Sequence, residues 1–255
     1  MIFDYYEILI LSLVQGISEF IPVSSSAHLF IISELFSFNN QSLLIDVGMH
    51  LGSLLAVLFY FRGDFFNILK NKQILNLIVI GSIPLILVGF VIYITGFIDI
   101  IRNLKLLAWL SLIFAIVLFF ADKVKITKKI DTDLNFKSIL IIGLFQVASL
   151  FPGVSRSGIV ITAGRFLNFD RYEASKISFY LSVPAIAGAS FLSLKDVFAN
   201  DVNFNLIVLF SVFLSFIFSF ITIKYFLIFI KKFNFNLFII YRIILSLIIF
   251  YIIYS

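Results

Sequence analysis

The chain alternates between long apolar runs and short polar segments. Uninterrupted apolar runs cover residues 43–61, 74–96, 104–120, 177–195, 204–230 and 235–254. A helix needs about 20 mainly apolar residues to cross the hydrocarbon core of a bilayer. We therefore predict six transmembrane helices.

Two further apolar regions, residues 1–37 and 138–167, are interrupted near their middles. The first contains FIPVSSSA and the second contains LFPGVSRSG. Proline removes a backbone donor and glycine loosens a helix, so each region is predicted to form a helix, an irregular turn and a second helix. Non-helical backbone at membrane depth persists only where protein or a water-filled cavity surrounds it. Both regions are therefore expected to be re-entrant helical hairpins.

The two hairpins resemble each other in sequence. When residues 13–28 are aligned with residues 144–159, without a gap, seven pairs are identical. These pairs are Leu13 and Leu144, Gln15 and Gln146, Ser18 and Ser149, Phe20 and Phe151, Val23 and Val154, Ser24 and Ser155, and Ser26 and Ser157. We interpret this match as an internal repeat.

Composition is typical of a polytopic membrane protein. Hydrophobic residues make up 62% and charged residues 13% of the 255 positions, whereas about 25% of residues are charged in soluble domains. One integral membrane domain, residues 1–255, accounts for the whole length. The net charge of +5 is better explained by basic loops than by nucleic-acid binding. Cysteine is absent, which excludes disulfides, and no Lys or Arg precedes Arg62, so no cleavable signal is predicted.

The distribution of Lys and Arg predicts the orientation of the hairpins. Four segments hold 13 of the 19 basic residues, and short cytoplasmic loops are enriched in such residues. These segments are residues 62–72, 121–137, 165–176 and 231–232, while Arg156, Lys224 and Arg242 fall within hydrophobic segments. If the four segments are cytoplasmic, the first hairpin enters from outside and the second from the cytoplasm. We therefore predict an all-α fold in which halves 1–120 and 138–255 form an inverted-topology repeat, with the hairpins meeting near the midplane.

The first hairpin carries candidate catalytic and metal-binding residues. Gln15 and Glu19 are four positions apart, on one face of a helix, where they could bind a divalent cation or orient a proton. Ser24, Ser25 and Ser26 follow in the turn, whose N–H groups and hydroxyls suit phosphate oxygens. Serine also serves simply as a helix N-cap. This turn is therefore a candidate substrate-binding site.

A histidine follows the serines. His28 lies three residues after Ser25, and a hydroxyl beside an imidazole has the parts of an activated nucleophile or of a general acid for a leaving phosphate. The sequence leaves open whether Ser25, His28 or water attacks phosphorus. His50, one turn after Asp46 in the next apolar run, is either an interfacial residue or a border of the same site.

The second hairpin supplies a positive charge. Arg156 takes the place of Ser25 in the repeat, and a guanidinium binds phosphate through two parallel hydrogen bonds. Its expected partner is Glu19 or an anionic ligand. We expect Glu19, His28 and Arg156 to surround one cavity. The further candidates for substrate binding in this hairpin are Gly153, Ser155, Ser157 and Thr162.

These motifs resemble those of a known family. GISEFIPVSSSAH, preceded by Gln15, and PGVSRSGIVIT, from Pro152 to Thr162, are similar to the signature motifs of the bacterial undecaprenyl-diphosphatase family, (E/Q)xxxE and PGxSRSxxT. DVGMHLGSLLAVLFYFR and SFYLSVPAIAGAS also resemble the family. The resemblance therefore covers most of the chain.

The resemblance implies hydrolysis of undecaprenyl diphosphate to the monophosphate that carries cell-wall precursors, with the site open to the external face of the bacterial inner membrane. It also implies dependence on a divalent cation, Mg²⁺ or Ca²⁺, and bacitracin resistance when the enzyme is abundant. The family's functional residues fall on Gln15, Glu19, Ser25, His28 and Arg156. Many members have Glu at the position of Gln15, and a neutral amide is a poorer ligand for such cations than a carboxylate.

Other functions remain open. Inverted repeats serve alternating access, so a secondary transporter or flippase of a polyprenyl phosphate is the alternative. A purely structural membrane protein is disfavoured because Glu19 and Arg156 are costly at membrane depth. The expected partners are the lipid substrate and membrane lipids, with no nucleic acid, and a homodimer is left open.

Overall fold

The computed structural model describes residues 2–36, 43–101, 103–126, 128–199 and 206–254. Within these ranges the chain is helical and contains no β-strand, apart from one isolated bridge between Lys128 and Phe169. The elements are α1 (Ile2–Ser18), α2 (Ser25–Phe36), α3 (Leu43–Tyr60), α4 (Arg62–Lys70), α5 (Lys72–Thr95), α6 (Phe97–Ile101), α7 (Leu104–Asp122), α8 (Ile130–Asp133), α9 (Phe136–Val147), the 3₁₀ turn η1 (Ala148–Leu150), α10 (Arg156–Phe166), α11 (Arg171–Ala199), α12 (Leu206–Lys232) and α13 (Asn236–Tyr254).

Six of these helices are long and apolar enough to cross a membrane: α3, α5, α7, α11, α12 and α13. They coincide with the six predicted runs, which confirms a multi-pass, all-α membrane protein. The largest difference in boundary is at the start of α11, which begins at Arg171, before the apolar run. Arg171 pairs with Asp122, and Lys176 pairs with Asp64. These ion pairs stabilise the polar start of the helix, residues 171–176, which the hydropathy pattern does not include in the apolar run.

Both remaining apolar regions are broken at the predicted turns. Residues 19–24 separate α1 from α2, and residues 148–155, which include η1, separate α9 from α10. Pro22 interrupts the first region. The second turn requires Gly153, whose φ is 85° and where a Cβ would lie 2.4 Å from the carbonyl oxygen of Leu107.

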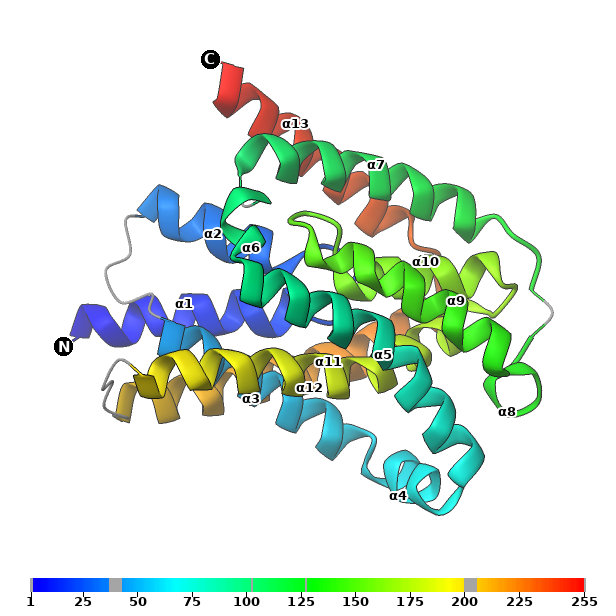
Figure 1. Ribbon diagram of the computed structural model, residues 1–255. Helices are drawn as coiled ribbons and strands as arrows, with labels where there is room; N and C mark the ends of the chain where they lie inside the picture. Colours follow the sequence, from blue (N-terminus) through cyan, green and yellow to red (C-terminus); the bar gives the residue numbers. More distant parts are fainter. Residues whose placement is uncertain (1, 37–42, 102, 127, 200–205, 255) are drawn as a thin grey trace.

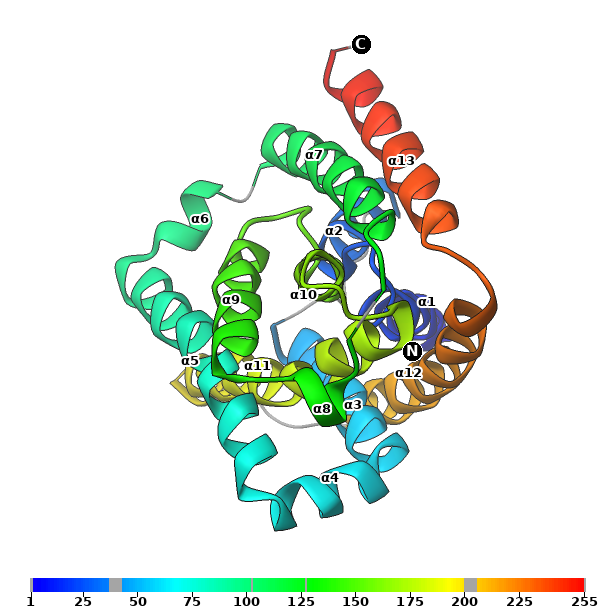
Figure 2. The same cartoon turned by 90° about the vertical axis from the view of Figure 1, so that its right-hand side faces the viewer.

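The two helix pairs bring their turns together in the interior of the molecule. In Figure 1, α1 and α2 occupy the end of the molecule that holds the N-terminus, whereas α9 and α10 come from the opposite end. Figure 2 shows α10 in the middle of the molecule and α1 beside α12. The two turns contact each other, since the Ser157 hydroxyl donates a hydrogen bond to the Ile21 carbonyl oxygen over 2.7 Å. Segments far apart in the sequence therefore meet in the interior.

Small residues bring α3 and α12 into close contact. A Cβ added to Gly48 would lie 2.7 Å from an atom of α12, and one added to Gly52 would lie 2.3 Å away. The Ser53 hydroxyl is within hydrogen-bond distance of the Ser215 and Ser219 hydroxyls, at 3.1 and 2.9 Å. Close packing and interhelical hydrogen bonds are the forces that pair helices in lipid. They fix the position of α3 relative to the interior hairpins.

A buried ion cluster holds the end of α10 that lies farther from the turn. Asp122, at the end of α7, accepts a hydrogen bond of 2.6 Å from Arg171 Nε and lies 3.4 Å from Arg165 Nε. The Phe235 backbone N–H also donates to this carboxylate. Arg165 is 1% exposed, and a buried charge is tolerated only when it is paired and hydrogen-bonded. The cluster thereby joins α7, α10, α11 and the turn before α13.

The close contact between α3 and α12 predicts the effect of one added methyl group. Gly52→Ala should lower the free energy of unfolding by about 1–3 kcal/mol, because the methyl group has no space. Gly63→Ala in α4 is the matched control, since a Cβ there meets nothing within 4 Å. Thermal unfolding of both variants in detergent measures the difference. Equal melting temperatures would contradict the close packing of α3 on α12.

Candidate active site

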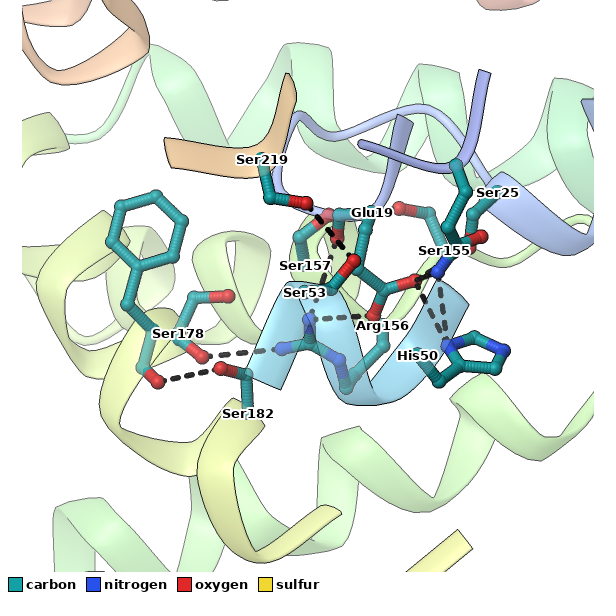
Figure 3. Close-up of polar contacts among 12 residues, drawn as sticks. Glu19, Ser25, His50, Ser53, Ser155, Arg156, Ser157, Ser178, Ser182 and Ser219 are labelled. Atoms are coloured by element: carbon teal, nitrogen blue, oxygen red, sulfur yellow. Dashed lines mark hydrogen bonds and ion pairs between the residues drawn. The ribbon is translucent and has the colours of Figure 1, made fainter. Parts of the chain in front are cut away.

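Glu19 is the centre of a polar cluster in the interior. It directly follows α1 and is 8% exposed. Its Oε1 accepts a hydrogen bond from Arg156 Nη2 over 3.1 Å, and its Oε2 accepts from Ser25 Oγ over 2.8 Å and from Gln15 Nε2 over 3.1 Å (Figure 3). The cluster unites residues from α1, α2 and α10. The structure thus brings Gln15, Glu19, Ser25 and Arg156 together, as the sequence predicts.

Arg156 is the first residue of α10 and connects the two hairpins. Besides the carboxylate, it contacts the Glu19 carbonyl oxygen, and its Nη1 donates to the Ser178 carbonyl oxygen of α11 over 3.2 Å. Its side chain is 12% exposed. Within the described part of the chain, Glu19 is the one carboxylate that forms an ion pair with it. A ligand that displaced this carboxylate would find a fixed, largely desolvated cation.

The other candidate binding residues serve mainly to shape the second turn. Ser155, whose φ is 70°, caps α10 through a hydrogen bond from the Gly158 N–H, and its hydroxyl lies 3.2 Å from that of Ser157. Thr162 donates to the Gly158 carbonyl oxygen within α10. Of these residues, Ser155 lines the cavity described below. The side chain of Ser26 lies outside the described part of the structure.

His28 does not join the cluster. Its Nδ1 lies 2.6 Å from the Ser24 carbonyl oxygen, one turn earlier, and its Nε2 lies 2.5 Å from the Tyr241 hydroxyl of α13. The expected convergence of Glu19, His28 and Arg156 is therefore found for Glu19 and Arg156 alone. The helical spacing explains this difference, because a side chain four positions after Ser24 folds back over the first turn of α2.

A different histidine reaches the cluster. His50 of α3 accepts a hydrogen bond at Nδ1 from Gln15 Nε2 over 2.9 Å, and the same nitrogen lies 3.9 Å from Glu19 Oε2. This finding decides between the two interpretations of His50, which borders the site. Two local signals point to it in the sequence, Asp46 one turn earlier and the family-like stretch that contains both residues. The position of α3 against α12, which directs His50 inward, depends on packing that sequence spacing does not reveal.

A cavity of about 720 Å³ opens beside the cluster. Its polar end contains Glu19, Ser24, Ser25, His50 and Arg156. Its flank is apolar and comes mainly from the second halves of α5 and α11. The flanking residues include Leu85, Ile86, Leu87, Phe90, Leu150, Phe151, Ile186, Phe191 and Leu192. Such a cavity suits a ligand with an anionic head and an apolar tail.

The described residues do not fit a metal site built by protein alone. No group of three or more His, Asp or Glu side chains suited to a metal occurs among them. Glu19 already accepts hydrogen bonds on both oxygens, and Gln15 directs its amide nitrogen toward it. The Gln15 Oε1 atom is buried without a hydrogen-bond partner, but one amide oxygen is too little for Mg²⁺ or Ca²⁺, which prefer several oxygen ligands.

The fold and the cluster define a class of protein. It is a multi-pass helical membrane protein with an interior ion pair beside a cavity that suits an amphiphilic ligand. Comparison with known proteins makes the class specific. Residues 8–248 match the family described as bacitracin resistance protein BacA, and the chain belongs to this family.

Named relatives agree with this assignment. The chain is 55% identical over 250 residues to an undecaprenyl-diphosphatase of Pelagibacter ubique (strain HTCC1062), covering 98% of each chain. It is 43% identical over 232 residues to an undecaprenyl-diphosphatase of Elusimicrobium minutum (strain Pei191), covering 88% of each. It is 38% identical over 197 residues to undecaprenyl-diphosphatase 3 of Bacillus cereus (strain ATCC 14579), covering 76% of each.

The interior ion pair predicts a coupled effect on stability. Arg156→Leu should lower the free energy of unfolding by about 3–5 kcal/mol, because it leaves the Glu19 carboxylate buried without a cation. Adding Glu19→Gln to that variant should restore much of the loss. Thermal unfolding of the two single variants and the double variant measures the coupling. Additive losses would mean that the two side chains do not depend on each other.

Proposed function

We propose that the chain is an integral-membrane phosphatase that hydrolyses undecaprenyl diphosphate to undecaprenyl phosphate and inorganic phosphate. The observation that carries this proposal is the cavity, which has Arg156 and hydroxyl groups at one end and an apolar flank beyond them. A lipid diphosphate needs both environments. The names of the relatives support the same substrate. The product would return as the carrier of cell-wall precursors, and abundant enzyme would give bacitracin resistance.

The contacts of Ser25 support its role as nucleophile. Its hydroxyl donates to Glu19 Oε2, which is placed to take the proton when Ser25 Oγ attacks the terminal phosphorus. A bond then forms between Oγ and phosphorus, the bond from phosphorus to the bridging oxygen breaks, and undecaprenyl phosphate leaves. Water hydrolyses the resulting phosphoserine and releases phosphate. Arg156 offsets the negative charge on the transferred group.

Helix lengths support re-entrant hairpins. α2 has 12 residues and α10 has 11, which at 1.5 Å per residue gives less than about 20 Å, whereas the hydrocarbon core is about 30 Å thick. The helix pairs approach from opposite ends (Figure 1). We infer a single integral domain with halves 1–120 and 138–255 in inverted orientation and a site near the midplane.

The distribution of charge supports an opening of the cavity on the external side. The cavity flank, residues 85–93 and 185–193, lies in the second halves of α5 and α11. The basic segments 62–72 and 165–176 lie near the starts of these helices. Because basic loops favour the cytoplasm, the cavity opens toward the external side of a bacterial inner membrane.

Transport of a polyprenyl phosphate is the competing function. In the inferred repeat, α3 and α12 correspond to α11 and α5, which form the cavity flank. Alternating access would require the contact between α3 and α12 to open toward the cytoplasm. Gly48 and Gly52 bring the backbones of these two helices into close contact. This packing favours a site that is reached from one side, which is sufficient for hydrolysis but not for transport.

Phosphate release from undecaprenyl diphosphate tests the proposed function. Purified protein in lipid nanodiscs should release one phosphate per substrate molecule. Ser25→Ala, Glu19→Gln and Arg156→Met should each lower kcat about 10²-fold or more, because each removes a group that acts in the transition state.

Ser193→Ala is the matched control for these variants. Ser193 lines the cavity on α11 and forms none of the Glu19 or Arg156 contacts described above, so its rate should stay within about twofold of that of the unmodified chain. Retained activity in Glu19→Gln or Arg156→Met would overturn the site. Movement of labelled undecaprenyl phosphate between leaflets without phosphate release would establish the transporter instead.

A divalent cation, Mg²⁺ or Ca²⁺, is expected to enter with the substrate, because the described residues form no metal cage and such cations bind readily through phosphate oxygens. EDTA should abolish phosphate release, and the activating cation concentration should depend on substrate concentration. Calorimetry with Mg²⁺ or Ca²⁺ and substrate-free protein should show no binding in the micromolar range. Tight binding without substrate would require a protein-built site.

A further inference from the structure

Two adjacent residues of α13 contact the two interior hairpins, one each. The Tyr241 hydroxyl lies 2.5 Å from His28 Nε2 on the first hairpin, and the two rings stack with centroids 5.5 Å apart. Arg242 Nη2 donates to the Gly153 and Val154 carbonyl oxygens on the second hairpin, over 2.8 and 3.1 Å. Consecutive residues project about 100° apart on a helix. α13 therefore reaches both hairpins from one side of the molecule.

Both ring nitrogens of His28 are engaged in these contacts. A carbonyl oxygen only accepts hydrogen bonds, so Nδ1 donates to the Ser24 carbonyl oxygen. Nε2 is occupied by the Tyr241 hydroxyl. The ring is not among the residues that line the cavity. Through His28, Tyr241 is therefore connected to the Ser24 backbone, directly before Ser25. His28 is not placed to bind a phosphate group in the cavity.

Arg242 has the corresponding position at the second turn. Its side chain is 1% exposed, and no described carboxylate forms an ion pair with it. The two carbonyl groups that it binds directly precede Ser155, whose φ of 70° is strained for a residue other than glycine. Such a backbone conformation persists only when its surroundings hold it. Arg242 therefore restrains the turn from which Arg156 projects.

We propose that Tyr241 and Arg242 form a clamp, the α13 clamp, that sets the position of one hairpin relative to the other. In this role His28, Tyr241 and Arg242 are positioning residues: His28 transmits the contact of Tyr241 to the first turn, and Arg242 acts directly on the second. The consequence for catalysis rests on the proposed function. The structural consequence does not, so the two are tested separately.

Hydrogen–deuterium exchange tests the clamp without any activity measurement. Tyr241→Phe should raise amide exchange about threefold or more in residues 24–29, where the His28 N–H donates to the Ser24 carbonyl oxygen, and leave residues 155–160 unchanged. Arg242→Met should do the reverse, and Arg242→Lys should restore part of the protection. Tyr251→Phe, at a position on α13 that is 75% exposed, is the control. Exchange in both segments equal to that of the control would overturn the clamp.

Phosphate release distinguishes a positioning role of His28 from a chemical one. Asn keeps an amide nitrogen near the place of Nδ1 but does not reach Tyr241, so His28→Asn and Tyr241→Phe break the same contact. Each should lower kcat about tenfold, the effect of one hydrogen bond, with KM within about twofold. The double variant should lose no more than either single variant.

Different failures point to different errors. A loss of 10³-fold in His28→Asn with full activity in Tyr241→Phe would assign His28 to the chemistry and refute its positioning role, as would losses that multiply in the double variant. Absence of phosphate release by the unmodified chain would refute the proposed function. In that case the exchange measurement still decides whether the clamp exists.

Discussion

The ion pair between Glu19 and Arg156 is the interaction on which the interior of this protein depends. Each residue lies beside a break in an otherwise apolar region, and neither charge is tolerated at membrane depth without a partner. Their pairing requires the two turns to meet, as the 3.1 Å contact shows. The surrounding helices then pack around the turns. The backbone groups of each turn that lack helical hydrogen bonds thus face protein rather than lipid.

The two hairpins contribute different chemistry to the site. At the aligned positions where the copies differ, the first has Glu19 and Ser25, and the second has Leu150 and Arg156. Where they are identical, the serines largely hold the turns in place, as Ser157 does through its bond to the Ile21 carbonyl oxygen. Two hairpins with matching serines and different charges thus form one asymmetric site. Its single carboxylate and single adjacent cation suit an anion that arrives with its own counter-ions.

Much of this arrangement could be predicted from the sequence because its causes are local. Hydropathy predicts the six long helices, and Pro22 and Gly153 predict the two breaks. The motifs and the cost of buried charge predict that Glu19, Ser25 and Arg156 belong together. The internal repeat and the inverted orientation predict that the two hairpins meet, and both stay predictions.

The remaining features depend on packing and helix phase. His28 is four residues after Ser24, which turns its ring toward the backbone and α13, whereas His50 enters the site because α3 packs closely on α12. Gln15 donates to Glu19 and His50 instead of offering a metal ligand. Sequence spacing identifies such residues as neighbours but does not show which atoms face each other.

The central claim is that Glu19 and Arg156, from different hairpins, act as one unit on a lipid diphosphate. The most direct test is kcat/KM for phosphate release from undecaprenyl diphosphate by Glu19→Gln, Arg156→Met and the double variant. Residues that act as a unit are strongly non-additive, so the double variant should lose no more than the more impaired single variant. Losses that multiply would show that the two residues act independently and would contradict a shared site.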